Sequence, residues 1–230
     1  MFGRPVLAFV LTILAGQPAL AAPMLLGAAA EPPAGLLDFC RRQPTDCGDD
    51  ADAVSRQVAD LDAEGPWRRR FALARASATP PTPAALDMTP ELWTQVRRVN
   101  DEINRAIRQR SDWASYGVAD RWATPLRAGG RPFGDCEDFV LEKRRALLAA
   151  GLPRGAVDIA LVVTRRGEAH AVLLLNTTLG EYALDNLTPW IVPWDEAPYE
   201  WRRREVGGDP LRWAAIASRE TPVVQLAFRQ

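Results

Sequence analysis

The chain contains little cysteine and almost no histidine: 230 residues include three cysteines and one histidine. A structural zinc site needs four cysteine or histidine ligands at short spacing, and this chain does not supply them. The sequence also lacks a GxSxG elbow, an HExxH helix and a glycine loop that cradles phosphate. Serine-hydrolase, zinc-protease and nucleotide-binding motifs are therefore missing, and attention turns to the few thiols and the single imidazole.

An excess of charge of either sign is missing too. The formal net charge is -1, so nothing in the composition argues for a nucleic-acid partner. The body of the chain holds no apolar run long enough to span a bilayer. With 47% hydrophobic and 25% charged residues, the composition indicates one ordinary globular domain with a real core.

The N-terminus has the features of a secretory signal. Arg4 provides a positive start, residues 6–16 ("VLAFVLTILAG") form a short apolar run, and Pro18 ends it. A small-x-small site predicts cleavage after Ala21. A membrane anchor is the alternative, but the run falls short of the roughly 20 residues that a span needs. We therefore expect a signal peptide over 1–21 and a periplasmic mature protein.

Export changes how the cysteines are interpreted. Cys40 and Cys47 lie in "FCRRQPTDC" and are close enough to form a small-loop disulfide in an oxidising compartment. Cys136 is then left over. A free thiol in such a compartment favours a functional role, although a small buried core thiol is the alternative.

The rest of the chain divides into a lead and a compact domain. We predict an exported lead over 22–86, followed by one compact domain over 87–230. The lead contains a flexible start (22–35), the Cys40–Cys47 segment, a helical insertion (50–78) and a proline-rich linker (78–85).

Within the compact domain, the hydrophobic period changes from helical to extended. An amphipathic helix is expected at 90–109, with Thr89 as its N-cap, and a second helix from Asp135 to Gly151. The predicted strands are 157–164, 169–176, 181–186, 190–194 and the tail 223–230. This order predicts an α+β fold, with helices packed on an antiparallel sheet. The long loop at 111–134 is of a kind that usually carries function.

Cys136 falls at the start of the second helix, where unpaired N–H groups favour a thiolate and could hold an oxyanion. The neighbouring carboxylates of Asp135, Glu137 and Asp138 oppose that ionisation. Two explanations stay open at this point. The acids stabilise the helix N-terminus, or Asp135 and Glu137 hold a calcium ion that cancels the repulsion.

The lone histidine begins a strand, and an acid ends the next one. If residues 176–179 form a four-residue loop, His170 lies directly opposite Asp185, with Cβ atoms about 5 Å apart. A one-residue slip would place Asn186 there instead. Cysteine, histidine and acid in this arrangement predict nucleophilic thiol chemistry.

These segments resemble a known family. "YGVADRWATP", "GDCEDFVLEKRRALLAAGLP", "HAVLLL" and "YALDNLT" are similar to the bacterial transglutaminase-like cysteine proteinases (BTLCP). The "FCRRQPTDC" start and "DPLRW" resemble the exported, LapG-type branch. The resemblance implies a papain-like or transglutaminase-like core with a Cys136, His170 and Asp185 triad, and a calcium ion held by Asp135 and Glu137.

The same resemblance implies a periplasmic peptidase without an organic cofactor. Members of this branch cleave cell-surface adhesins in biofilms and are sequestered by an inner-membrane cyclic di-GMP receptor. The chain departs from the pattern in the insertion at 48–86 and in Ala171, where methionine is usual. A transglutaminase or amidase using the same acyl-enzyme, and a binding module with a relict triad, remain alternatives.

Overall fold

The computed structural model describes residues 24–48, 52, 54–56, 58, 59, 84–127 and 132–217. The predicted signal peptide and the predicted tail strand lie outside these residues, as does most of the insertion and of the proline-rich linker. Among the described residues, no helix has the length and apolar character needed to cross a bilayer.

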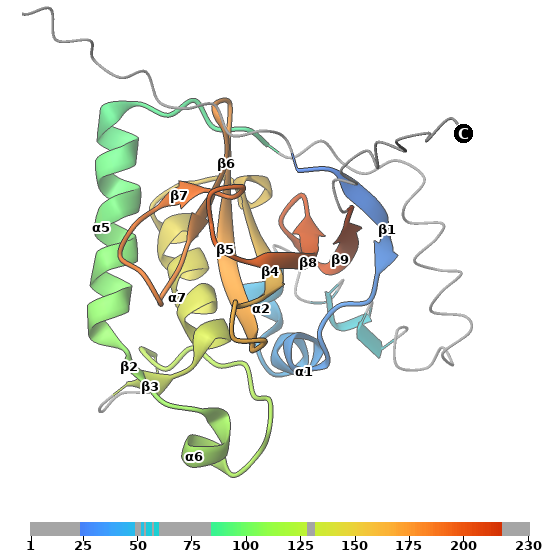
Figure 1. Ribbon diagram of the computed structural model, residues 1–230. Helices are drawn as coiled ribbons and strands as arrows, with labels where there is room; N and C mark the ends of the chain where they lie inside the picture. The colour runs from blue at the N-terminus through green and yellow to red at the C-terminus, as the bar shows by residue number, and fades with distance from the viewer. Residues whose placement is uncertain are drawn as a thin grey trace, which may run out of the picture.

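The elements are β1 (Leu26–Ala30), α1 (Ala34–Arg42), α2 (Pro44–Cys47), α5 (Pro90–Ala106), β2 (Arg108–Gln109), α6 (Asp112–Tyr116), β3 (Phe133–Gly134), α7 (Cys136–Ala149), the 3₁₀ turn η1 (Arg154–Ala156), β4 (Val157–Val163), β5 (Ala169–Thr177), β6 (Gly180–Leu184), β7 (Val192–Pro193), β8 (Glu200–Val206) and β9 (Asp209–Ile216). From α5 onward the long helices precede the strands of the large sheet, as the sequence predicted, but one strand of that sheet, β1, comes before all the helices (Figure 1).

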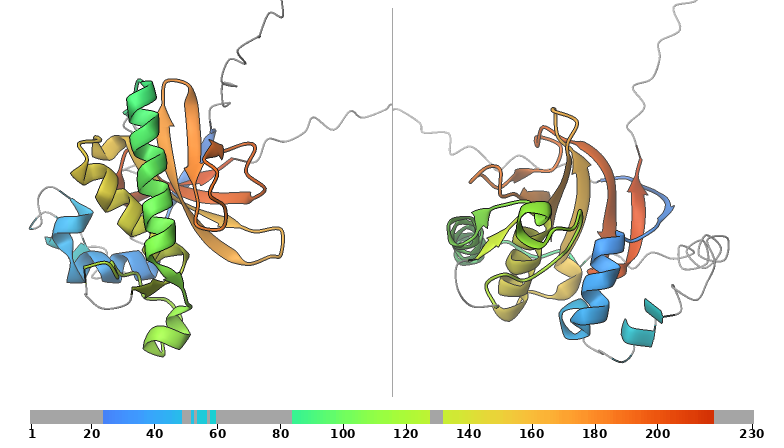
Figure 2. Two further views of the ribbon diagram at one scale, coloured as in Figure 1. Left: turned by 90° about the vertical axis from the view of Figure 1, so that its left-hand side faces the viewer. Right: turned by 90° about the horizontal axis from the view of Figure 1, so that it is seen from below.

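One antiparallel sheet organises the described residues, with strand order β1-β9-β8-β4-β5-β6-β7. The three helices α1, α5 and α7 lie on one side of it (Figure 2). The α+β class, with helices packed on an antiparallel sheet, is therefore confirmed. α7 packs against β5, the neighbour of the central strand β4. The start of the helix faces this strand, because the backbone N–H of Ala171 lies against the Cys136 thiol.

The core fills both faces of the sheet. On β5, Ala171, Leu173 and Leu175 pack toward the helices, whereas Val172 and Leu174 pack into a second cluster on the other face. This alternation follows from the two-residue period of a strand. Because both faces are buried, the strand has a continuous apolar sequence rather than an alternating one.

Local signals position the two main helices. The Thr89 side chain accepts a hydrogen bond from the N–H of Leu92 at 3.2 Å, and Pro90 occupies the first turn, as predicted. α7 begins at Cys136 and is followed by Gly151, whose φ of 94° suits only glycine well. The thiol therefore stands on the first residue of a rigid, well-packed helix.

The predicted disulfide is confirmed: Cys40 and Cys47 are bonded, with Cα atoms 5.6 Å apart. The bond joins α1 to α2. Cys136 is left as a free thiol, as the sequence predicted.

The predicted flexible start is wrong for residues 24–35. β1 pairs antiparallel with β9, and Leu36 and Phe39 of the following helix are buried in the helix-side core. The alanines and glycine of this stretch give no strand signal of their own, and pairing with β9 supplies the stability. The domain boundary at residue 87 stays a prediction, although β1 and α1 share the sheet and the core with later residues.

The sequence also missed β8 and β9. β8 carries three consecutive arginines, a pattern that indicates a solvated surface. Arg204 is nevertheless 1% exposed, because its guanidinium forms ion pairs with Asp158 and Glu181. A buried cation with two carboxylate partners is thus compatible with a central strand.

Candidate active site

The thiol of Cys136 sits where α7 meets β5. Its Sγ donates a hydrogen bond to Oε2 of Glu137 at 3.1 Å, and the backbone N–H of Ala171 also faces it. Burial, followed by the charge of Glu137, raises the pKa of the Cys136 thiol, while the Ala171 N–H lowers it. In this arrangement the thiol bonds to the carboxylate and not to the imidazole. The sulfur nevertheless lies beside the residue that directly follows His170.

The imidazole is held by a buried carboxylate. Nε2 of His170 lies 2.8 Å from Oδ1 of Asp185, and the two residues are 6% and 2% exposed. Oδ1 also accepts the N–H of Leu187 at 3.1 Å, and the Tyr199 hydroxyl donates to Oδ2. Burial acts to raise the pKa of Asp185, but the hydrogen bonds from His170 and Tyr199 outweigh it, and the pKa is lowered. An ionised carboxylate only accepts, so the proton is on Nε2 and Nδ1 is the basic nitrogen.

The hairpin register differs from the prediction by two residues. Thr177 pairs with Gly180, so the loop has two residues instead of the four expected at 176–179. The Thr177 hydroxyl donates to the Gly180 carbonyl at 2.6 Å and accepts the N–H of Leu179 at 3.1 Å, which closes a tight turn. A shift of two keeps every side chain on its face. His170 and Asp185 therefore meet diagonally rather than directly opposite one another.

Tyr199 is a residue that sequence reasoning missed. Its ring lies 5.6 Å from the His170 ring, tilted by 51°, while its hydroxyl holds Asp185. The residue precedes β8, and no local motif marks it. Only the folded sheet brings it to the carboxylate.

An acid cluster adjoins the thiol. Single carboxylate oxygens of Asp112, Asp135 and Asp138 lie within 4.8 Å of one another, and those of Asp112, Asp120 and Glu137 form a second such group. The two predicted ligands, Asp135 and Glu137, are thus split between two groups that share Asp112. Asp112 and Asp120 come from the loop at 111–134, whose unusual length was the one sequence signal for them.

Backbone contacts tie this loop to the start of α7. The N–H of Asp112 donates to Oδ2 of Asp135 at 3.0 Å, and the N–H of Ala123 donates to Oδ1 of Asp138 at 2.7 Å. Asp135 occupies the N-cap position, but its side chain makes no capping hydrogen bond. Helix capping therefore does not explain this carboxylate.

The donor set fits a hard cation. Asp112, Asp135 and Asp138 each leave one buried carboxylate oxygen without a partner among the residues that the structure describes. Burial and the charge of Asp135 raise the pKa of Glu137 to about 8. Burial and the charges of Asp135 and Asp112 raise the pKa of Asp138 to about 8, although the hydrogen bond from the Ala123 N–H acts to lower it. Crowded carboxylate oxygens of this kind are the ligands that calcium prefers.

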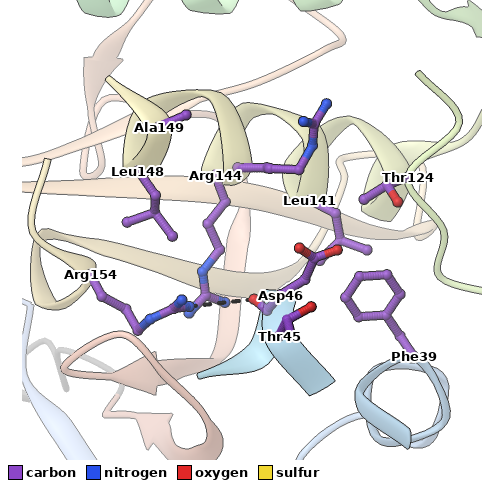
Figure 3. Close-up of a pocket in the computed structure, with 10 residues that line it drawn as sticks. Phe39, Thr45, Asp46, Thr124, Leu141, Arg144, Leu148, Ala149 and Arg154 are labelled. Atoms are coloured by element: carbon purple, nitrogen blue, oxygen red, sulfur yellow. Dashed lines mark hydrogen bonds between the residues drawn. The ribbon is translucent and has the colours of Figure 1, made fainter. Parts of the chain in front are cut away.

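A separate pocket of about 240 Å³ lies along the second half of α7 (Figure 3). It is lined by Phe39, Thr45, Asp46, Thr124, Leu141, Arg144, Arg145, Leu148, Ala149 and Arg154. Neither the thiol, the His170–Asp185 pair nor the acid cluster contributes to it. The reactive groups are therefore at the other end of the helix.

Comparison with known proteins agrees with the sequence motifs. The family model of the bacterial transglutaminase-like cysteine proteinases (BTLCP) matches residues 73–221, more than half of the chain. Among solved structures, calcium-bound Legionella pneumophila LapG is 20% identical, covers 73% of this chain and 82% of its own, and has a TM-score of 0.44. EGTA-treated LapG from the same organism is 21% identical, covers 75% and 82%, and has a TM-score of 0.42.

Comparison with curated proteins gives no significant match. The family match includes the helix that carries the thiol and the hairpin that carries the imidazole and its carboxylate. The chain belongs to the bacterial transglutaminase-like cysteine proteinase family and is a transglutaminase-like cysteine peptidase.

Proposed function

We propose that this peptidase acts in the periplasm, depends on calcium, and cleaves exported or cell-surface proteins through a Cys136, His170 and Asp185 triad. The observation that carries the proposal is the buried hydrogen bond between Nε2 of His170 and Asp185. It fixes the tautomer so that Nδ1 is free to take the proton of a thiol. The sulfur of Cys136 lies beside Ala171, the next residue of the same strand.

The reaction follows from these positions. His170 accepts the Cys136 proton at Nδ1, and the thiolate attacks the carbonyl carbon of the scissile peptide bond. N–H groups at the start of α7 have no helical acceptor and would stabilise the oxyanion. The imidazolium then protonates the leaving amine. Water, deprotonated by His170, hydrolyses the thioester and restores the thiol.

Asp112, Asp135 and Asp138 would hold the calcium ion, because their carboxylates converge and each retains an unpartnered oxygen. Glu137 would contribute through the second group, which it forms with Asp112 and Asp120. When bound, the cation would offset the negative charge that disfavours a thiolate beside Glu137. Asp112 links the two acid groups, so we expect it to contribute most to binding. This residue was not among the predicted ligands.

The substrate is proposed only as a class. The sequence resemblance extends to a surface adhesin as substrate and to an inner-membrane cyclic di-GMP receptor as regulator, and both stay predictions. Periplasmic location depends on the N-terminal signal, which lies outside the described residues. The confirmed disulfide supports an oxidising compartment.

A substrate-trap experiment tests the function. Purified wild-type protein and Cys136→Ala are incubated with the exported and surface proteins of the source cell in calcium chloride, and new N-termini are sequenced. We expect new termini with wild-type protein only, and capture of an intact substrate by the variant. Glu102→Ala, at an exposed site on α5, is the matched control and should cleave normally. Cleavage by Cys136→Ala would refute the proposal, and incorporation of a lysine analogue would indicate a transferase instead.

A further inference from the structure

Lys143 is the only lysine in the chain, which contains 27 arginines. It is 0% exposed, and its Nζ has no hydrogen-bond partner among the described residues. Lysines are almost never fully buried without a partner, because an ammonium loses its hydration there. Packing alone would be served better by leucine or methionine at this position. The burial of this one amine therefore calls for an explanation other than packing.

The position of Lys143 connects it to the reactive end of α7. It follows Cys136 by seven residues, two helical turns, and so lies on the same face of the helix. Two charges act on the amine: Asp185, which attracts it more strongly, and Asp101 on α5. Asp101 is 40% exposed and is paired with Arg105, so solvent screens its influence. Asp185 is buried, and its field reaches Lys143 largely unscreened.

Two asparagines of α5 hold the chain segment that carries Asp185. Nδ2 of Asn104 donates to the Asp185 carbonyl at 2.8 Å, and Nδ2 of Asn100 donates to the Pro189 carbonyl at 3.3 Å. The Oδ1 atom of each asparagine is buried and has no partner in the described chain. The two asparagines that hold this segment thus carry buried amide oxygens without donors, and Lys143, which the charge of Asp185 attracts, carries a buried ammonium without acceptors. These groups are complementary in hydrogen bonding, since an ammonium carries three donors.

We propose that Lys143 is a positioning residue for the peptidase reaction, whose buried ammonium attracts the carboxylate of Asp185 and helps to keep it ionised and oriented toward Nε2 of His170. The proposal rests on the triad of the proposed function. Burial lowers the pKa of Lys143 to about 7, with Asp185 as the main opposing influence. The amine is therefore sensitive to the charge of Asp185 near neutral pH.

The single lysine permits a direct spectroscopic test. Protein labelled with ¹³C-lysine gives one side-chain signal, which reports on Lys143 alone. In calcium chloride, we expect Asp185→Asn to move the midpoint of its titration to lower pH, because the attraction that favours the charged amine is lost. Asp101→Asn is the matched control and should change the midpoint much less. An identical midpoint in wild type and Asp185→Asn would overturn the proposal.

A second measurement separates positioning from structure. Cys136 is the free thiol of the chain, so its alkylation by iodoacetamide is followed by intact mass without any substrate. We expect Lys143→Met to slow alkylation at pH 7 by about tenfold, which corresponds to 1.36 kcal/mol, while the urea midpoint stays unchanged or rises. Leu147→Met, one turn further along α7 and equally buried, is the control and should react as wild type does.

The outcomes distinguish the two proposals. If His170→Ala slows alkylation and Lys143→Met does not, the positioning role of Lys143 is refuted while the triad stands. If His170→Ala itself has no effect, the proposed function fails. A Lys143→Met variant with a lowered urea midpoint and an unaltered lysine titration in Asp185→Asn would assign the amine a purely structural role.

Discussion

Replacing Tyr199 with phenylalanine tests the support of the His170–Asp185 pair most sharply. The substitution removes one hydroxyl, which donates to Oδ2 of Asp185, and retains the ring beside His170. Asp185 is 2% exposed, so water does not replace the lost donor. A hydrogen bond to a buried charged group contributes about 1.5–3 kcal/mol. We expect Tyr199→Phe to lower the free energy of unfolding by about that amount at pH 7.

The pH dependence of this loss follows from linkage. Folding lowers the pKa of Asp185 from its ordinary value of 3.8, so the ionised carboxylate stabilises the protein above that value. This contribution disappears as the pH falls through the folded-state pKa. The difference between Tyr199→Phe and wild type should therefore be full at pH 7 and shrink under acid conditions below about pH 4.

The assay is urea unfolding at pH 7, 5 and 3, combined with a double-mutant cycle using Asp185→Asn. A coupling free energy of at least about 1 kcal/mol between the two positions is expected at pH 7. A coupling near zero, or a destabilisation that grows as the pH falls, would show that the hydroxyl does not act on the ionised carboxylate.

Two further predictions concern the acid cluster and the buried arginine. Calcium should raise the melting temperature by about 5–10 °C at a concentration 100 times its dissociation constant. EGTA should reverse this rise and lower activity, and Asp112→Asn should abolish the response to calcium. A protein whose melting temperature and activity do not respond to EGTA would contradict the proposed metal site. Arg204→Met should destabilise the fold by about 3–5 kcal/mol, measured by urea unfolding, because Asp158 and Glu181 lose their buried counter-charge. Adding Asp158→Asn and Glu181→Gln should recover much of that loss, and a neutral Arg204→Met would refute the role assigned to the pair.

Strong local periodicity made much of the fold predictable from sequence. Thr89 and Pro90 mark the start of α5, and the apolar run of β5 follows from burial on both faces of the sheet. The strand at β8 could not be predicted in this way. Its buried arginine, Arg204, is paired with Asp158 and Glu181, which are distant in sequence, and no local pattern indicates such pairing.

The candidate site shows the same division. Cys136 could be placed at a helix N-terminus because the acids that precede and follow it are typical of a first turn. The face shared by His170 and Asp185 was predictable since an error of two residues does not change it. Tyr199 and Asp112 were missed, because each reaches its partner only through the tertiary fold.

The central claim is that Cys136 and His170 act together. Its most direct test is the rate of iodoacetamide alkylation of Cys136 at pH 7 in saturating calcium, compared between wild type and His170→Ala. An isolated thiol with a pKa of about 8.5 is only a few per cent ionised at that pH, so pairing with the imidazole should make wild type react at least about tenfold faster. Equal rates in the two proteins, with both folded, would contradict the account.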